Sequence, residues 1–264
     1  MTPRKSLSLI VAALLASTGA LAKAPELERG PTASADIPLR TLSQAAKAAG
    51  VTEADVGDAD SFGRNLRWLG LTDAQVELSN DCSPFTDPSV GCQVLAPAGG
   101  LTSFSFENLG HVKLPKKAAT SLLCYWLSPV LNVSYGNPTA APVVAQLNYL
   151  PTLTVENSVL DDPSLIDPST GLPFGGRMIT GMTASERLQV PLPPGLHLTE
   201  RSRDSAVCIA GFLSRKALIE GSGLSPAQAD EFFKRETTVR LNVSGSARYV
   251  DGASLYFGLR IVGD

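Results

Sequence analysis

The sequence predicts a mainly β protein: an antiparallel β-sandwich or open barrel, with one short helix near 225–234 and a small helical N-terminal segment. Three observations indicate this fold class. From about Leu101 onward, apolar and polar residues alternate with a period of two, the period of a strand with one buried face. A capped helical pattern begins at Ser225. The even number of cysteines, 4, suits a disulfide-stabilised domain.

Residues 1–22 are typical of a secretory signal peptide. Arg4 and Lys5 precede an apolar run, and an A-x-A cleavage site ends at Ala22. The run is shorter than the roughly 20 residues that cross a bilayer, which argues against a membrane anchor. We therefore expect a periplasmic or secreted protein with no transmembrane segment in the mature chain.

The charge balance bears on the class of partner. The 264 residues carry 22 Lys+Arg and 25 Asp+Glu. Without residues 1–22, which hold two basic residues and no acid, 20 basic and 25 acidic residues remain, a net charge of −5. Binding to nucleic acid relies on a basic excess that displaces counterions. We expect no nucleic-acid partner, and assign the partner only as an unknown protein or envelope component.

The chain divides into three predicted parts: a signal peptide at 1–22, an extended lead-in with a short helical segment at 23–80, and a β-rich disulfide-stabilised domain at 81–264. In the lead-in, Thr52 and Thr72 each follow an apolar residue and precede a polar residue three positions later. This pattern is typical of a helix start. The segment after Thr72 also alternates as a strand would, so both structures stay open there.

Alternation in the β-rich domain predicts successive strands. One-sided strands are expected around Phe104, Leu131–Tyr135, Val143–Tyr149 and Leu188–Leu192. Pro191 marks the last of these as an edge strand or a bend. Apolar runs without alternation surround two of the cysteines and predict central strands.

Two further strands are expected at 239–249 and 255–261, joined at Asp251-Gly252. A two-residue turn there would place the two apolar rows on opposite faces. A three-residue loop of residues 250–252, with Gly252 left-handed, restores the agreement and sets Ala247 opposite Leu255. We therefore expect a paired hairpin with that loop.

The four cysteines permit three pairings in an oxidising compartment. Cys82 and Cys92 enclose a turn-rich loop whose prolines and glycine can bring its ends together. Cys124 and Cys208 lie in the two apolar runs. We favour the pairs Cys82 with Cys92 and Cys124 with Cys208.

A calcium site is considered at Asp55, Asp58 and Asp60. Calcium loops carry acidic oxygens at alternate positions followed by a glycine, here Gly63. Phe62 stands where a further oxygen ligand is needed, so an acidic turn is the simpler interpretation. Apart from this possible calcium ion, we expect no cofactor.

The segment between Asn157 and Arg177 is a candidate binding loop. It carries Asp161, Asp162 and Asp167 together with three prolines, and it lacks a periodic pattern. Long loops of this kind are often binding or gating elements, although a decorated hairpin explains the same sequence equally well.

The motifs that would identify an enzyme are weak. The chain has no G-x-S-x-G elbow, and the candidate bases are His111 and His197. Glycoside hydrolysis needs two facing carboxylates. The glutamates in or near predicted strands are Glu107, Glu156, Glu186 and Glu200.

The sequence therefore favours a non-enzymatic, ligand- or partner-binding envelope protein. The alternative is a secreted hydrolase whose active site assembles only in space. Two facing carboxylates would favour the hydrolase, whereas a flat or loop-rimmed surface would favour binding. Trp68 and Trp126 stand in apolar contexts, and we expect them in the core.

Overall fold

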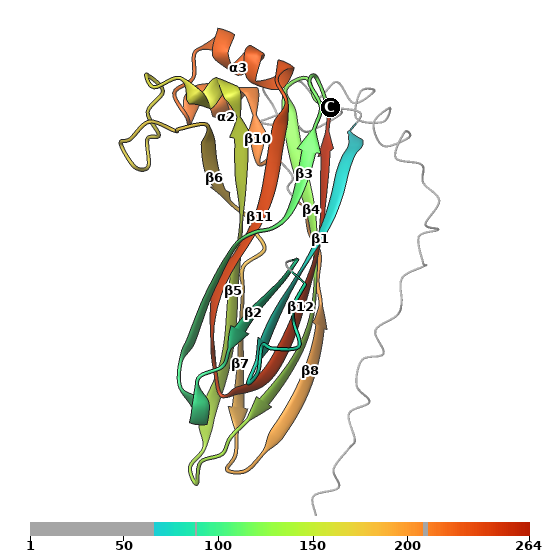
Figure 1. Ribbon diagram of the computed structural model, residues 1–264, viewed down its shortest axis with the longest axis vertical. Coiled ribbons are helices and arrows are strands. Elements are labelled where there is room, and N and C mark those ends of the chain that lie inside the picture. Colours follow the sequence, from blue (N-terminus) through green and yellow to red (C-terminus); the bar gives the residue numbers. More distant parts are fainter. Residues whose placement is uncertain (1–65, 88, 208–210) are drawn as a thin grey trace, which may run out of the picture. The chain divides into compact units, whose positions relative to one another are not determined.

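The computed structural model describes residues 66–87, 89–207 and 211–264. In this part of the chain two β-sheets pack face to face, as the alternation predicted (Figure 1). Sheet A has seven strands: β1 (Arg67–Ser79), β2 (Val90–Val94), β4 (Leu122–Gly136), β8 (His197–Arg203), β9 (Ala206–Val207), β10 (Leu213–Ser214) and β12 (Val250–Gly263). Sheet B has five strands: β3 (Thr102–Leu114), β5 (Val143–Asn157), β6 (Arg177–Gly181), β7 (Glu186–Leu192) and β11 (Thr237–Arg248).

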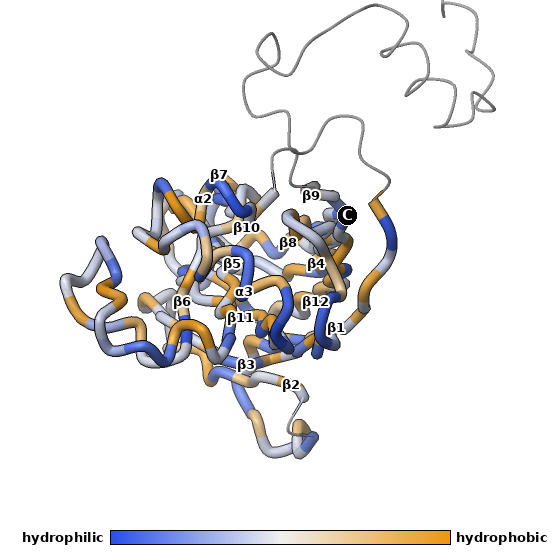
Figure 2. Tube along the Cα trace, turned by 90° about the horizontal axis from the view of Figure 1, so that it is seen from above, coloured by the Kyte–Doolittle hydropathy of each residue, from blue (hydrophilic) through white to orange (hydrophobic). Residues whose placement is uncertain are grey.

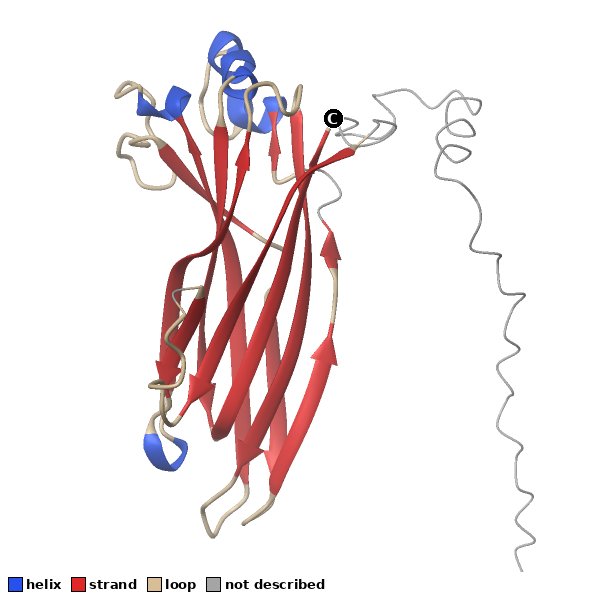
Figure 3. Ribbon diagram, turned by 45° about the vertical axis from the view of Figure 1, so that its right-hand side comes forward, coloured by secondary structure: helices blue, strands red, loops and turns tan. Residues whose placement is uncertain are grey.

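Short helices complete the fold. α2 (Arg215–Glu220) and α3 (Pro226–Lys234) lie at one end of the sandwich (Figure 3). The predicted helix near 225–234 is confirmed as α3, which begins after Ser225 in a capping box with Gln228. The 3₁₀ turns are η3 (Pro97–Gly99) and η4 (Ser158–Asp161). None of the helices in the described ranges is long and apolar enough to cross a membrane.

Most strands are paired antiparallel, and the exception is the parallel pair β1–β2. In sheet A, β4 pairs with β12 on one side and with β8, β9 and β10 in succession on the other. In sheet B, β11 lies between β3 and β5, and β5 also pairs with β6 and β7. Seen from above, the two sheets form two layers (Figure 2). One edge is formed by β3 beside β1 and β2, and the other, which we call the open edge, by β7 and β8.

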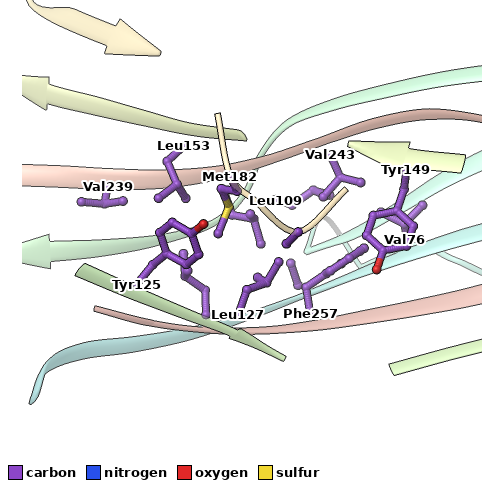
Figure 4. Packing of buried hydrophobic residues seen from close by; sticks show 14 of the residues in the cluster. Val76, Leu109, Tyr125, Leu127, Tyr149, Leu153, Met182, Val239, Val243 and Phe257 are labelled. Atoms are coloured by element: carbon purple, nitrogen blue, oxygen red, sulfur yellow. The ribbon is translucent and has the colours of Figure 1, made fainter. Parts of the chain in front are cut away.

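The core fills the space between the sheets. Inward residues of β12 such as Leu255 and Leu259 are fully buried, as are Leu241 and Val243 of β11. The rings of Tyr149 and Phe257 meet edge to face with centroids 5.5 Å apart, which joins β5 to β12 across the layers (Figure 4). Burying each such side chain contributes roughly 1.5–3 kcal/mol, so these rows hold the sheets together.

The predicted hairpin between the last two strands is wrong. β11 pairs with β3 and β5 in sheet B, whereas β12 pairs with β4 and β1 in sheet A. The two apolar rows were assigned to the correct faces, but they meet across the core and not along a ladder. The chain changes sheets at Tyr249, whose φ of 55° is left-handed, while Gly252 is not among the residues with positive φ. Alternation defines a buried face, and it does not tell which sheet supplies the opposing face.

β1 lies inside the segment predicted as a lead-in. It pairs with β12 from Arg67 to Leu78, with Ala74, Val76 and Leu78 buried in the core. The strand alternative for this segment is therefore the observed one, and the sandwich includes residues before 81. The predicted signal peptide and the helix start predicted at Thr52 lie outside the described residues, so both stay predictions.

One of the two predicted disulfides is confirmed. Cys82 and Cys92 are bonded, with their Cα atoms 5.8 Å apart. Cys124 is also disulfide-bonded, and it lies in β4, a central strand as expected. Cys208 lies outside the described residues, so its pairing with Cys124 stays a prediction. The backbone of Val207 pairs with Trp126, which brings the chain to within two residues of Cys124 and supports this pair.

Three crossings between the sheets meet at the end opposite to α2 and α3. Asn137, in the β4–β5 connection, is completely buried. Its N–H donates to Leu196 O (3.0 Å), its carbonyl accepts from Gly195 N (2.9 Å), and its Nδ2 donates to Leu192 O (3.0 Å), all around the β7–β8 connection. The neighbouring Gly136 N–H donates to Tyr249 O (3.1 Å), where β11 passes to β12. Hydrogen bonds of Asn137 and of the Gly136 backbone therefore tie these crossings together.

Asn137→Ala is expected to lower the free energy of unfolding by about 2–3 kcal/mol, because it leaves buried carbonyl oxygens without donors. The measurement is urea denaturation followed by circular dichroism. Asn132→Ala, at an exposed asparagine of the preceding strand β4, is the control and should change stability by less than about 0.5 kcal/mol. Equal losses in both variants would contradict the role assigned to Asn137.

Asp264 fastens the end of β12 to the start of β4. Its Oδ1 accepts the N–H groups of Thr120 (3.0 Å), Ser121 (2.9 Å) and Leu122 (3.1 Å), and its Oδ2 accepts the Ser121 hydroxyl (3.0 Å). Burial raises the pKa of this carboxyl, but these donors outweigh burial and lower the pKa from 3.8 to about 2.

Because the folded-state pKa of Asp264 lies below its ordinary value, its stabilisation is present above about pH 4 and is lost as the pH falls toward the folded pKa. Solvent screening of this partly exposed group limits the gain, so we expect Asp264→Asn to cost about 1 kcal/mol near pH 7. The cost should disappear near pH 2 in parallel urea titrations. A cost that is independent of pH would contradict the carboxylate's role.

Candidate functional site

The outer face of sheet A carries exposed aromatic side chains. Trp126 of β4 pairs with Arg260 of β12, and Val130 pairs with Tyr256 four residues further along. Trp68 lies near the start of β1. Trp68, Trp126 and Tyr256 are 59%, 38% and 46% exposed. We call the surface formed by these five residues the aromatic face.

Arg260 lies between the two tryptophans. Its guanidinium carbon is 5.2 Å from the ring centroid of Trp68 and 5.3 Å from that of Trp126. Such cation–π contacts stabilise the guanidinium group of Arg260 in its position between the two rings. The expectation that Trp68 and Trp126 belong to the core is therefore wrong. Trp126 and Asn132 are six residues apart on β4, so they lie on the same side of the strand, which faces solvent. The alternation therefore indicated exposure of Trp126, but its apolar neighbours suggested a buried position.

Small residues lie between the two ends of the aromatic face. Between Trp126 and Val130 lies Ser128, which pairs with Gly258 of β12. A Cβ placed at Gly258 would come no closer than 3.9 Å to any atom outside its chain neighbours, so the space above it is open. Four residues along a strand span about 13 Å. Small residues thus leave room for a planar group between the flanking side chains.

Tyr256 is held in place by a hydrogen-bonded group on β1 and β12. Gln75 Nε2 donates to the Tyr256 hydroxyl (3.0 Å) and to Glu77 Oε1 (2.6 Å). The Ser254 hydroxyl donates to Glu77 Oε2 (2.8 Å). Glu77 is only 6% exposed, so this group forms a rigid polar border to the aromatic face.

The outer face of sheet B is different, because its polar side chains satisfy one another. Arg240 donates twice to Glu156, from Nε at 2.7 Å and from Nη2 at 2.9 Å. The bond from Arg240 lowers the pKa of Glu156, although partial burial opposes the shift. Asn242 Nδ2 donates to the Thr154 hydroxyl, and Ser246 donates to Asn148. These polar side chains of sheet B are therefore bonded within the sheet.

The candidate binding loop is built as a decorated hairpin. Asp162 accepts the N–H and hydroxyl of Ser164, and Asp167 accepts those of Ser169. These bonds lower the pKa of both carboxyls. They are Asx turns, in which an aspartate stabilises the local bend. A binding role for the loop stays a prediction.

Asp161, the third acid of this loop, lies at a separate mixed-charge cleft of about 450 Å³. The side chains around this cleft include both basic and acidic groups, so its charge favours no single class of ligand. The lining residues are Lys116, Glu156, Asn157, Ser158, Asp161, Gly176, Arg235 and Glu236.

The structure does not gather the other candidate catalytic residues. His111 of β3 is the strand partner of Arg240 of β11. His197 lies elsewhere on the surface, where its Nδ1 is 2.8 Å from Asp251 Oδ2. The described ranges contain no group of three His, Cys, Asp or Glu side chains arranged to hold a metal. Asp55, Asp58 and Asp60 lie outside them, so calcium binding there stays a prediction.

At the open edge, two carboxylates lie close together whose proximity the sequence did not predict. Glu186 of β7 pairs with Tyr149 of β5 and shares its inward face. Partial burial, a hydrogen-bonding contact with Asp204 and the charge of Asp204 together raise the pKa of Glu186. Glu186 was considered as a strand glutamate, but no local signal marked Asp204 as its neighbour.

No protein-family model and no curated protein matches the chain. Among solved structures, it is similar to T=1 particles derived from infectious bursal virus (9% identity, TM-score 0.17) and to the infectious bursal disease virus VP2 subviral particle (8% identity, TM-score 0.15). These alignments cover 75% of this chain and 36% and 38% of those chains. The chain thus spans little more than a third of their length, and similarity this low carries no argument about function.

Exposure of both tryptophans has a direct spectroscopic test, because the chain has 2 tryptophans in all. We expect acrylamide to quench the fluorescence of the folded protein nearly as strongly as that of the urea-unfolded chain. Trp68→Phe and Trp126→Phe variants separate the two signals. Strong protection of either tryptophan in the folded state would mean that the aromatic face is covered.

Proposed function

We propose that this protein is an exported, non-enzymatic binding protein of the cell envelope whose aromatic face binds an acidic polysaccharide. The observation that carries the proposal is the exposed stack of Trp68, Arg260 and Trp126. Exposed apolar groups of this size commonly mark interaction sites. The export signal and the disulfide support a place outside the cytoplasm.

The chemistry of the face suits a sugar chain. The C–H faces of a pyranose ring are apolar and pack against aromatic rings, while its hydroxyl groups need hydrogen-bond partners. The aromatic face offers Trp126 and Tyr256 at its two ends, with Ser128 between them and Gln75 at the border. An aromatic ring with a polar tip is well suited to such partly wet contacts.

The basic side chains on the same face favour an acidic sugar. Arg203 pairs with Val130 and Arg201 pairs with Asn132, so both arginines share the outer face with Arg260. Both are exposed. An arginine fork binds carboxylate or sulfate groups in two-pronged geometry. The net charge of −5 expected for the mature chain disfavours a nucleic acid as the polyanion.

The hydrolase alternative rests on the contact between Glu186 and Asp204. Glycosidases need their carboxyl groups at least about 5 Å apart, so that the sugar or a water molecule fits between them. These two groups lie in hydrogen-bonding contact. The geometry therefore favours binding over glycoside hydrolysis.

The binding test uses affinity electrophoresis of the mature chain in gels with polygalacturonate, a uronic-acid polymer, or with neutral dextran. We expect retardation by polygalacturonate, which weakens with salt because arginines contribute. Trp126→Ala and Arg260→Met should each weaken the affinity about tenfold or more.

Matched controls come from the outer face of sheet B. Ile179→Ala removes an exposed apolar residue, and Arg187→Met removes an exposed arginine. Neither change should alter the retardation. Equal migration of the wild type in both gels, or equal losses in the controls, would refute the proposed face.

A further inference from the structure

Charge is distributed unevenly across the outer face of sheet A. At the β8 edge, Arg201 and Arg203 are exposed on this face. On the other side of β12, the strand β1 carries two acids, Asp73 and Glu77. Asp73 is exposed, and it shares the outer face because its strand partner is Gly258. A polyanion on this face is therefore attracted toward β8 and repelled from β1.

The outer side of β4 forms an exposed path beside the basic edge. We call this path the β4 track, and its residues are Trp126, Ser128, Val130 and Asn132. All four remain at least partly exposed. Trp126 and Val130 offer apolar surface to the C–H groups of a sugar, while Ser128 and Asn132 offer hydrogen-bonding groups to its hydroxyls. Both kinds of contact thus alternate along one strand.

Positive charge lies at both ends of the β4 track. Arg260 pairs with Trp126 at one end, and Arg201 pairs with Asn132 at the other. Six residues along the strand separate these ends, which is about 20 Å. Each pyranose unit lengthens a polymer by roughly the spacing of two neighbouring strands, about 5 Å. A run of about five units therefore spans the track, whereas two units reach only one end.

We propose that the β4 track binds about five consecutive units of an acidic polysaccharide, which lie along β4 beside β8 and do not cross β1. This inference rests on the proposed function and specifies the length and direction of the bound segment. Trp126 and Arg260 hold one end, and Arg201 binds a carboxylate at the other. Asp73 sets the direction, because a chain across β1 would bring like charges together.

The experiment measures the dissociation constants of galacturonate oligomers of defined length by isothermal titration calorimetry of the mature chain at constant ionic strength. We expect the pentamer to bind about tenfold more tightly than the dimer, or better, because only the pentamer reaches both ends of the track. The heptamer should gain at most about threefold more, since it offers three overlapping pentamers. Attraction by charge alone would instead raise the affinity steadily with each added carboxylate.

Variants test the far end of the track and the direction of the chain. Arg201→Met should weaken pentamer binding about fivefold or more and leave the dimer unchanged, because the dimer is held at Trp126. A general loss of stability would not change the ratio of the two affinities. Arg187→Met, at an exposed arginine of sheet B, is the matched control and should alter neither. Asp73→Asn should bind the pentamer at least as tightly as the wild type.

Failure of this inference is distinguishable from failure of the proposed function. Polygalacturonate may retard the wild type only if the face binds the polymer at all, so equal migration with and without it refutes both proposals. Retardation together with equal affinities for dimer and pentamer, or with a steady rise through the heptamer, overturns the β4 track alone. The track is also overturned if Arg201→Met behaves as Arg187→Met does, or if Asp73→Asn loses as much affinity as Arg201→Met.

Discussion

Asn137 and the neighbouring Gly136 tie together three of the points where the chain passes from one sheet to the other. The β4–β5, β7–β8 and β11–β12 connections all cross between sheets A and B, and they are hydrogen-bonded to one another at the same end. Because β11 and β12 are central strands of different sheets, this end sets how the layers face each other. The buried rows, including Tyr149 against Phe257, follow from that arrangement.

This connectivity makes the two edges and the two outer faces unequal. β7 and β8 are consecutive strands that lie in different sheets and are not paired, so an edge stays open between them. On sheet B, pairs such as Arg240 and Glu156 satisfy each other. On sheet A, Arg260 contacts two exposed rings and leaves apolar surface in contact with water. The stack of Arg260 with two aromatic rings on sheet A is the basis of the proposed function.

Much of the fold was predictable, because alternation is a local property of a strand. It identified β3, β4, β5 and the faces of β11 and β12, while Ser225 marked the start of α3. The loop between Cys82 and Cys92 is short enough for its pairing to be inferred. The candidate surfaces were mostly missed. Trp126 was assigned to the core because its neighbours are apolar, although its parity along β4 pointed outward.

The sequence by itself determined which side of each strand is buried, where α3 begins and which cysteines close the short loop. These features depend on residues close together in the chain. Only the tertiary structure decided that β11 and β12 join different sheets, that Arg260 lies between Trp68 and Trp126, and that Glu186 meets Asp204. Those contacts join separate strands, and the pairing of distant strands depends on the packing of the whole core.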